Sequence, residues 1–215
     1  MRFDFHSHTL ISDGELLPSE LARRAMILGH DAIAITDHVD FTNVERAVSE
    51  VLKAVDLCED YLKIIPGVEI THVPPSRIPK LAKQARELGA EWIVVHGETV
   101  SEPVAEGTNL AAVSCPDVDL LAHPGLIEEE EVQIAVDNGV ILEISGRRGH
   151  CLTNGHVASL SMRLGAEMLI NSDGHAPQDL MTRERAEIVA LGAGLDQARA
   201  ERALEGLPLE LLKRL

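Results

Sequence analysis

The sequence predicts an α/β protein in which a parallel sheet closes as a TIM-like barrel within a single domain over residues 1–215. Three observations lead to this prediction. Short aliphatic runs alternate with amphipathic segments, the links between them are short, and several predicted helices end at glycine. Repeated strand and helix with short links indicate a parallel sheet. About seven such units favour a barrel smaller than the usual eightfold one, with an open doubly wound sheet as the alternative.

The predicted strands are short runs of mainly aliphatic residues. They are Phe3–His6, Ala32–Ile35, Lys63–Ile70, Trp92–Val95, Leu120–Ala122, Val140–Ile144 and Met168–Ile170. Aromatic residues make up only 2% of the chain, so the core must be built from Leu, Ile, Val and Ala.

The predicted helices lie between these strands. They are Pro18–Leu28, Val44–Tyr61, Ile78–Leu88, Glu128–Asn138 and Gly155–Leu164. Four of them are followed by a glycine that suits a left-handed C-cap: Gly29, Gly89, Gly139 and Gly165. One or two further helices over Asp196–Leu215 are expected to pack on the outside. The long irregular passage Gly97–Pro116, with a short helix at Asn109–Val113, is a candidate lid or substrate-contact loop.

The composition is that of a globular protein in a reducing compartment. Hydrophobic residues make up 45% and charged residues 25% of the chain. The three cysteines lie far apart without a Cys-x-x-Cys spacing, which argues against a disulfide framework and a thiolate zinc cage. No apolar stretch approaches the roughly 20 residues that a membrane span needs. We therefore expect a cytoplasmic protein without a membrane partner.

The formal net charge of −16 disfavours a nucleic-acid partner, because nonspecific affinity for phosphate backbones comes largely from Lys and Arg. Bound divalent ions would still make a site locally positive. The expected partner is therefore a small phosphorylated metabolite.

Potential metal ligands recur along the chain. His6 and His8 form a His-x-His pair in the first predicted strand, where side chains two residues apart leave on the same side. The other potential ligands each follow a short aliphatic run, where a buried strand should end: Asp37-His38, Glu69, His96, His123, and Asp173 with His175. Catalytic groups of barrels and open sheets lie at the carboxyl ends of the strands. A lone histidine there is more often structural, but the series together predicts a metalloenzyme. His72 is expected either near the site or in an exposed turn.

The motifs His-Ser-His, Thr-Asp-His, Pro-Gly-Val-Glu, Val-His, Ala-His-Pro and Ser-Asp-Gly-His, in this order, resemble those of the PHP (polymerase and histidinol phosphatase) family over residues 4 to 175. The resemblance implies a distorted (β/α)7 barrel that holds two or three divalent metal ions and hydrolyses phosphoesters, similar to stand-alone proteins related to histidinol phosphatase.

The resemblance also implies a ligand set. One ion would be held by His6, His8, Glu69 and Asp173. Glu69 would bridge to a second ion bound by His96 and His123. A third ion would be held by Asp13, His38 and His175, although Ser-Asp-Gly around Asp13 is also an ordinary turn sequence.

Imidazole and carboxylate ligands together suit Zn, Mn and Fe, and the absence of cysteine ligands argues against a purely structural zinc site. A bridging carboxylate can hold two ions that acidify a shared water, so the expected nucleophile is a metal-bridged hydroxide. Glu69, Asp173 and His175 are the expected catalytic residues, and Asp37 is expected to orient a ligand from behind.

Arg147 and Arg148 follow a predicted strand and are the expected phosphate-binding residues, because guanidinium pairs well with phosphate. A solvated basic turn is the alternative. The predicted function is a metal-dependent phosphatase or phosphodiesterase acting on a small anionic metabolite. The alternatives are a noncatalytic metal-binding or regulatory module and a metal-dependent hydrolase of a C–N or C–O bond.

Overall fold

The computed structural model describes residues 1–58 and 60–215 and confirms the predicted barrel. Its parallel strands follow the order β1-β2-β4-β5-β6-β7-β8, and the short β3 pairs with β4. The strands are β1 (Phe3–Asp4), β2 (Ala32–Ile35), β3 (His38–Val39), β4 (Lys63–Ile70), β5 (Trp92–His96), β6 (Leu120–Ala122), β7 (Ile141–Ser145) and β8 (Met168–Asn171).

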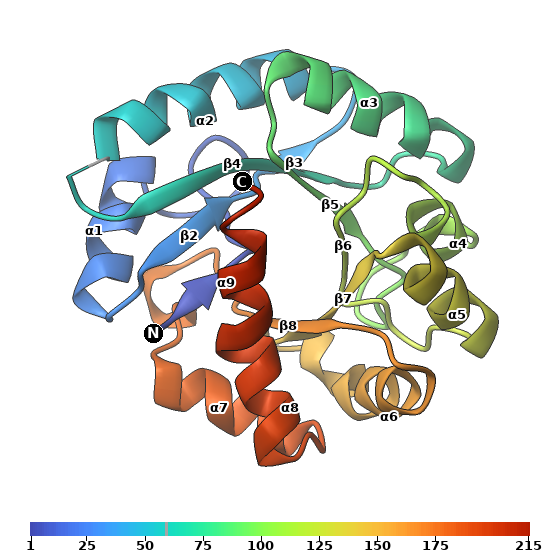
Figure 1. Cartoon of the computed structure of the whole chain (residues 1–215). Helices are drawn as coiled ribbons and strands as arrows, with labels where there is room; N and C mark the ends of the chain where they lie inside the picture. Colours follow the sequence, from blue (N-terminus) through green and yellow to red (C-terminus); the bar gives the residue numbers. More distant parts are fainter. Residues whose placement is uncertain (59) are drawn as a thin grey trace.

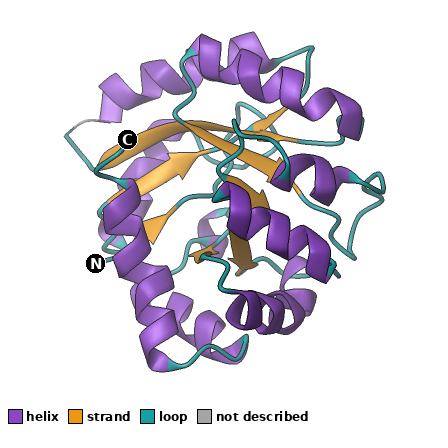
Figure 2. Ribbon diagram, turned by 45° about the vertical axis from the view of Figure 1, so that its right-hand side comes forward, coloured by secondary structure: helices purple, strands orange, loops and turns teal. Residues whose placement is uncertain are grey.

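Helices surround the strands (Figures 1 and 2). The α-helices are α1 (Pro18–Ile27), α2 (Val44–Cys58), α3 (Ile78–Leu88), α4 (Thr108–Val113), α5 (Glu129–Asn138), α6 (Asn154–Leu164), α7 (Arg183–Gly192), α8 (Gln197–Glu201) and α9 (Leu207–Leu211). Short 3-10 turns are η1 (Pro75–Arg77), η2 (His150–Thr153) and η3 (Pro177–Asp179), and a π-helical turn, η4 (Arg202–Gly206), joins α8 to α9. Gly89, Gly139 and Gly165 adopt the left-handed C-cap conformation that the sequence predicts.

The structure corrects three expectations about the elements. The predicted helix Val44–Tyr61 ends at Cys58, and position 59 lies outside the described residues. The strand β3 and the helix α7 are additions to the predicted set. The C-terminal segment was expected on the outside, but Leu207 and Leu211 of α9 pack against the inner core of the barrel.

The core has two layers because alternate strand residues point to opposite faces of a sheet. On β2, Ile33 and Ile35 belong to the layer between strands and helices, whereas Ala32 and Ala34 belong to the inner layer. The inner layer also contains Phe3, Phe5, Ile65, Trp92, Val94, Leu120, Ala122, Ile141 and Leu169. Leucines of α9 cover it, so the barrel interior is a packed core.

The same alternation positions the polar residues of the barrel interior. Glu69 lies four residues after the inward-facing Ile65, and His96 lies two residues after Val94. Glu143 and Asn171 each follow an inward-facing aliphatic residue by two positions. Apolar side chains therefore fill most of the barrel interior, and buried polar side chains gather at the carboxyl ends of the strands.

The barrel closes between β1 and β8 with few backbone contacts. One isolated parallel bridge joins Ser7 to Gly174, and the His8 amide donates to the Gly174 carbonyl at 2.9 Å. Side chains supply the rest of this closure: the Phe5 amide donates to Asn171 Oδ1 at 2.9 Å, and the Ser172 amide donates to Asp4 Oδ1 at 3.1 Å.

Across the described residues, no helix is both long enough and apolar enough to span a bilayer.

Candidate metal centre

Four side chains from opposite ends of the chain meet at the carboxyl end of the barrel. His6 Nε2 lies 3.4 Å from Glu69 Oε1 and 3.6 Å from Asp173 Oδ1. His8 Nε2 lies 3.5 Å from Glu69 Oε2 and 3.2 Å from Asp173 Oδ1. The structure therefore brings together His6, His8, Glu69 and Asp173, and all four are buried. Their spacing suits a common metal ion more than direct hydrogen bonds.

The His-x-His pair reaches this position beyond the first strand. The strand β1 ends at Asp4 because the Phe5 amide pairs with the Asn171 side chain instead of a neighbouring backbone carbonyl. The two rings still face one site, since His6 Nε2 and His8 Nε2 lie 3.1 Å apart.

A second group contains three imidazoles. The ring nitrogens of His96, His123 and His150 lie within 4.8 Å of one another. His123 Nε2 also lies 3.5 Å from Glu69 Oε1, so Glu69 stands between this group and the first. His96 directs Nδ1 to the Gly97 carbonyl at 3.2 Å, which turns Nε2 toward the pocket.

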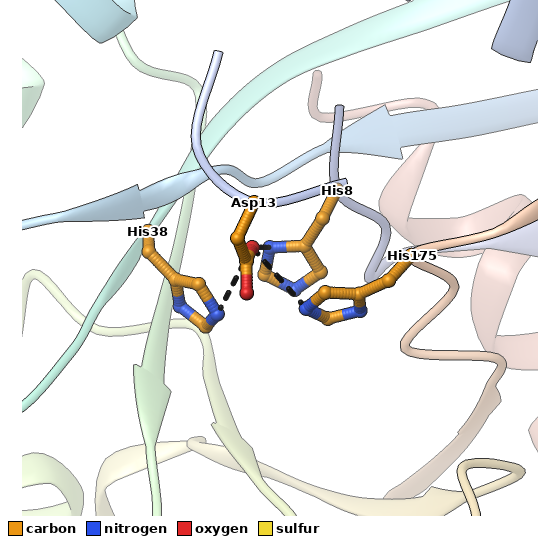
Figure 3. A group of neighbouring side chains, drawn as sticks. All are labelled: His8, Asp13, His38 and His175. Carbon is orange, nitrogen blue, oxygen red and sulfur yellow. Dashed lines mark ion pairs between the residues drawn. The ribbon is translucent and has the colours of Figure 1, made fainter. Parts of the chain in front are cut away.

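The third group joins Asp13, His38 and His175, and His8 lies beside them. Figure 3 shows the Asp13 carboxylate facing three rings, with Oδ1 at 3.4 Å from His175 Nε2, 3.6 Å from His38 Nε2 and 4.0 Å from His8 Nδ1. Asp13 is the most exposed member, because 56% of its side chain is accessible.

Asp37 fixes the turn that carries Asp13. Its carboxylate accepts hydrogen bonds from the Thr9 amide and hydroxyl, both at 2.8 Å, and from the Ser12 amide and hydroxyl at 3.0 and 2.6 Å. Asp37 thus acts on the Asp13 turn rather than on the neighbouring His38 ring, whose Nδ1 lies 2.6 Å from Thr71 Oγ1.

Glu143 supports the centre from beneath. Its Oε1 accepts from His6 Nδ1 at 2.8 Å and from Asn171 Nδ2 at 3.0 Å, and its Oε2 accepts from the His123 amide at 3.1 Å. In the neutral ring, donation from Nδ1 leaves His6 Nε2 without a proton, which is the tautomer that a metal ligand needs.

The second and third groups and Asp173 of the first group line a pocket of about 360 Å³. His6, His8 and Glu69 are buried and do not line it. Arg147 lies in its wall, with Nε 3.6 Å from Asp173 Oδ2 and Nη1 donating to the Asp173 carbonyl at 3.1 Å. Arg148 is exposed and is absent from the pocket lining. His72 also lines the pocket.

The backbone is strained around this pocket. The non-glycine residues with positive φ in the described chain are His72 (52°), His123 (26°) and Asp173 (50°), and all three line the pocket. Such conformations cost of the order of 1–3 kcal/mol each and persist where the surrounding structure enforces them, most often at functional sites. For His123, the bond from its amide to Glu143 is one such restraint.

The donor set fits divalent metal ions. Among the described residues, neither oxygen of the fully buried Glu69 accepts a well-aligned hydrogen bond, and His8 Nδ1 and His123 Nδ1 have no partner. The ring nitrogens around Glu69 include His38 Nδ1, which lies 2.7 Å from Oε2. A buried carboxylate without well-aligned donors is destabilising, and a cation held with the surrounding imidazoles removes this cost.

Without bound metal, the pKa values of the ligand imidazoles shift in both directions. Burial would lower the pKa of His6, but Glu143, Asp173 and Glu69 raise it well above its usual range. Burial would also lower the pKa of His38, but Glu69 raises it to about 9. Burial would raise the pKa of Glu69, but the neighbouring His6, His38 and His96 hold it well below its usual range. Burial raises the pKa of Asp173 to about 6, although His6 and His123 oppose this shift. Burial, against the charge of Glu69, lowers the pKa of His96 to about 4, and burial together with His123 lowers the pKa of His150 to about 3. These two imidazoles are therefore neutral at pH 7, as ligands must be.

Three residues of the site were missing from the sequence-based set. Glu143 could have been found, because a carboxylate inside the aliphatic run Ile141–Ser145, two residues after Ile141, shares the inward face of the strand with Ile141. His150 and Glu102 lie in loops, and no local pattern distinguishes them.

Comparisons with known proteins agree with the fold and show the family. The PHP domain model matches residues 4–135. The chain is 52% identical over 218 residues to Uncharacterized protein MJ1295 of Methanocaldococcus jannaschii, with 100% of both chains covered. It is 24% identical over 227 residues to Ribonuclease P protein component 3 of Methanosarcina mazei, covering 99% of this chain and 89% of that protein. A cryo-EM structure of archaeal ribonuclease P with mature tRNA includes a chain of the same fold (TM-score 0.71, 18% identity, 99% of this chain and 89% of that chain covered).

The relatives correct the expectation about partners. The net charge of −16 led us to disfavour nucleic acid and to expect a small phosphorylated metabolite, whereas a relative matched over nearly its whole length is named as a ribonuclease P protein component. Net charge is a poor criterion here, because it sums the whole surface and omits bound metal ions, so it does not describe the local field at a site.

Proposed function

Because the chain belongs to the PHP domain family, we propose that it is a metal-dependent phosphoester hydrolase that acts on the terminal phosphate of an RNA or a nucleotide. The observation that carries the proposal is the position of Glu69. Its buried carboxylate accepts no well-aligned hydrogen bond and lies within 3.5 Å of ring nitrogens from all three groups of ligands.

Two or three ions of Zn, Mn or Fe are the proposed cofactors. The first would be held by His6, His8, Glu69 and Asp173, the second by Glu69, His96, His123 and His150, and the third by Asp13, His38 and His175. Mixed imidazole and carboxylate ligands suit these metals. When bound, the ions would acidify a water molecule and stabilise the charge that develops on the phosphoryl oxygens.

The protein's own residues supply orientation and recognition. Glu143 fixes the tautomer of His6, and Asp37 holds the turn of Asp13. Arg147 is the proposed phosphate-binding residue, because its guanidinium lies in the pocket wall beside Asp173. A guanidinium at this place favours phosphorus chemistry over hydrolysis of a C–N or C–O bond.

The pocket supports a terminal phosphate as the substrate. At about 360 Å³ it has room for a phosphate and part of one nucleotide, and the groups that would hold the metal ions lie at its floor. The similarity to a ribonuclease P protein component supports RNA as the substrate class.

A second candidate is a noncatalytic subunit of an RNA–protein complex. The similarity to the ribonuclease P protein component favours this candidate, because the match covers 89% of that protein. In that case the ions would stabilise the fold without turnover.

The test is hydrolysis by purified protein loaded with Mn or Zn. The substrates are oligoribonucleotides with a 5′- or a 3′-terminal phosphate and a generic aryl phosphate. We expect metal-dependent release of phosphate or a terminal nucleotide, its loss in Glu69→Gln, and its retention in the control Glu130→Gln, which changes an exposed carboxylate. Full metal loading without turnover on every substrate would reject the enzyme and favour the second candidate.

A further inference from the structure

We propose that Glu102 is an exchangeable carboxylate ligand of the second metal group, which occupies the position of the substrate phosphate until the substrate displaces it. This inference rests on the proposed function, because it assumes that metal ions bind there and that a phosphate enters.

Glu102 lies on the loop between β5 and α4 and reaches three imidazoles from three different loops or strand ends. Its carboxylate oxygens lie 3.2 Å from His96 Nε2, 3.6 Å from His150 Nε2 and 3.7 Å from His72 Nε2. The side chain of Glu102 is 40% exposed, whereas those of His96 and His150 are 3% and 4% exposed. A solvent-accessible carboxylate thus closes the outer side of a buried cluster of ring nitrogens.

The same loop holds His150 in place. Thr99 Oγ1 lies 2.6 Å from His150 Nδ1, so Nε2 of this ring faces His123, His96 and Glu102. The close approach depends on Gly149. A Cβ there would lie 2.9 Å from Ser101 Oγ, and its φ of +93° disfavours other residues. One short segment, Thr99–Glu102, therefore positions a buried ligand and supplies an exposed one.

The base of the loop is anchored away from the pocket. The Glu98 amide donates to Asn109 Oδ1 at 2.9 Å, and the Asn109 amide donates to Glu98 Oε1 at 2.9 Å. Glu98 therefore ties the loop to α4, whereas Glu102 lines the pocket. A movement confined to the outer part of the loop would withdraw Glu102 and leave this anchor in place.

Charge explains why displacement is required. Arg147 and Glu102 both line the pocket, and Arg147 is the proposed phosphate-binding group. A phosphate that reaches Arg147 and the second ion would lie close to the Glu102 carboxylate, and like charges a few ångströms apart repel each other at a partly buried site. The carboxylate and the phosphate are thus alternative occupants of one position.

The experiment uses protein loaded with Co²⁺ and compares wild type, Glu102→Ala and the isosteric Glu102→Gln. The control is Glu106→Ala, which changes an exposed carboxylate on the same loop outside the pocket lining. The visible absorption of Co²⁺ reports its ligands, calorimetric titration with inorganic phosphate reports occupation of the anion position, and elemental analysis gives the metal content.

We expect both Glu102 variants to retain their metal content and to change the Co²⁺ spectrum of the phosphate-free protein. They should also bind inorganic phosphate about tenfold more tightly than wild type, because the competing negative charge of Glu102 is gone. The control should match wild type. An unchanged spectrum with unchanged phosphate affinity would show that Glu102 is not a ligand. Loss of one ion that phosphate does not restore would show a permanent ligand. Either result overturns the proposal, and neither requires turnover, so the outcome is separate from that of the hydrolysis test.

Discussion

Replacement of Glu143 by glutamine would show how much the buried support beneath the metal centre contributes. The carboxylate of Glu143 is fully buried and accepts three hydrogen bonds, two at Oε1 from His6 and Asn171 and one at Oε2 from the His123 amide. A glutamine side chain offers one acceptor oxygen and one amide donor. It can therefore replace only one of the two carboxylate oxygens.

The better orientation of the introduced glutamine directs its oxygen to His6 and Asn171. Its NH₂ group then faces the His123 amide, so two donors meet and the backbone N–H is left unpaired. An unpaired buried donor costs about 1–3 kcal/mol. Loss of residues that orient metal ligands typically lowers metal affinity 10- to 100-fold. We therefore expect Glu143→Gln to lower the free energy of unfolding of the metal-free protein by about 2 kcal/mol, and the affinity for the first ion to fall by at least about tenfold.

Urea unfolding of the protein after removal of metal by a chelator measures the free energy of unfolding. Competition with a chromophoric chelator measures the metal affinity. Glu143→Ala removes all three bonds and should lose more affinity than Glu143→Gln. The exposed Glu130→Gln serves as the control. Wild-type metal affinity in both Glu143 variants would refute the inference that this carboxylate orients His6.

Three further predictions concern other parts of the molecule. Burial, with a contribution from Arg2, lowers the pKa of His30 to about 4, so the folded state keeps this ring neutral while the unfolded state takes up a proton below pH 6.5. The free energy of unfolding should therefore fall by up to about 3 kcal/mol as the pH falls from 6.5 toward 4. Unfolding curves of His30→Gln should lack this component. Asp37→Ala removes four hydrogen bonds from the Thr9–Asp13 turn, so elemental analysis should show loss of the ion at the Asp13 group with the other ions retained. Uniform loss of all ions would contradict a role of Asp37 that is limited to this turn. Leu211→Ala should destabilise the protein by about 2–4 kcal/mol, because this side chain covers the inner core; a change within error in thermal or urea unfolding would place α9 outside the folded core.

Most of the fold was predictable because buried strands and amphipathic helices leave strong periodic patterns. The strands β2, β4 and β6 and the helix α3 have the predicted bounds. The exceptions have physical reasons. The strand β3 has two residues, too few for any periodicity, and α7 buries only Ala186 and Ala190, which leaves a weak apolar face.

The candidate site was partly predictable for a related reason. Glu69 and His96 follow aliphatic runs whose alternation continues into the site, so their position at the strand ends could be inferred from the sequence. His150 and Glu102 depend on how two loops meet at Gly149 and Ser101. That contact forms only in the tertiary structure. Loop residues have no periodic pattern in the sequence from which it could be inferred.

The closure of the barrel and the organisation of the first metal group are physically linked. Asn171 accepts from the Phe5 amide with Oδ1, which helps to join β8 to β1, and donates to Glu143 with Nδ2, which supports the acceptor of His6. His6 comes from the β1 side of this junction and Asp173 from the β8 side. Metal ions held between them would therefore connect the two strands where, among the described residues, the backbone ladder has only one isolated bridge. The centre thus lies at the least paired junction of the sheet, where ligand binding can contribute to folding as well as to chemistry.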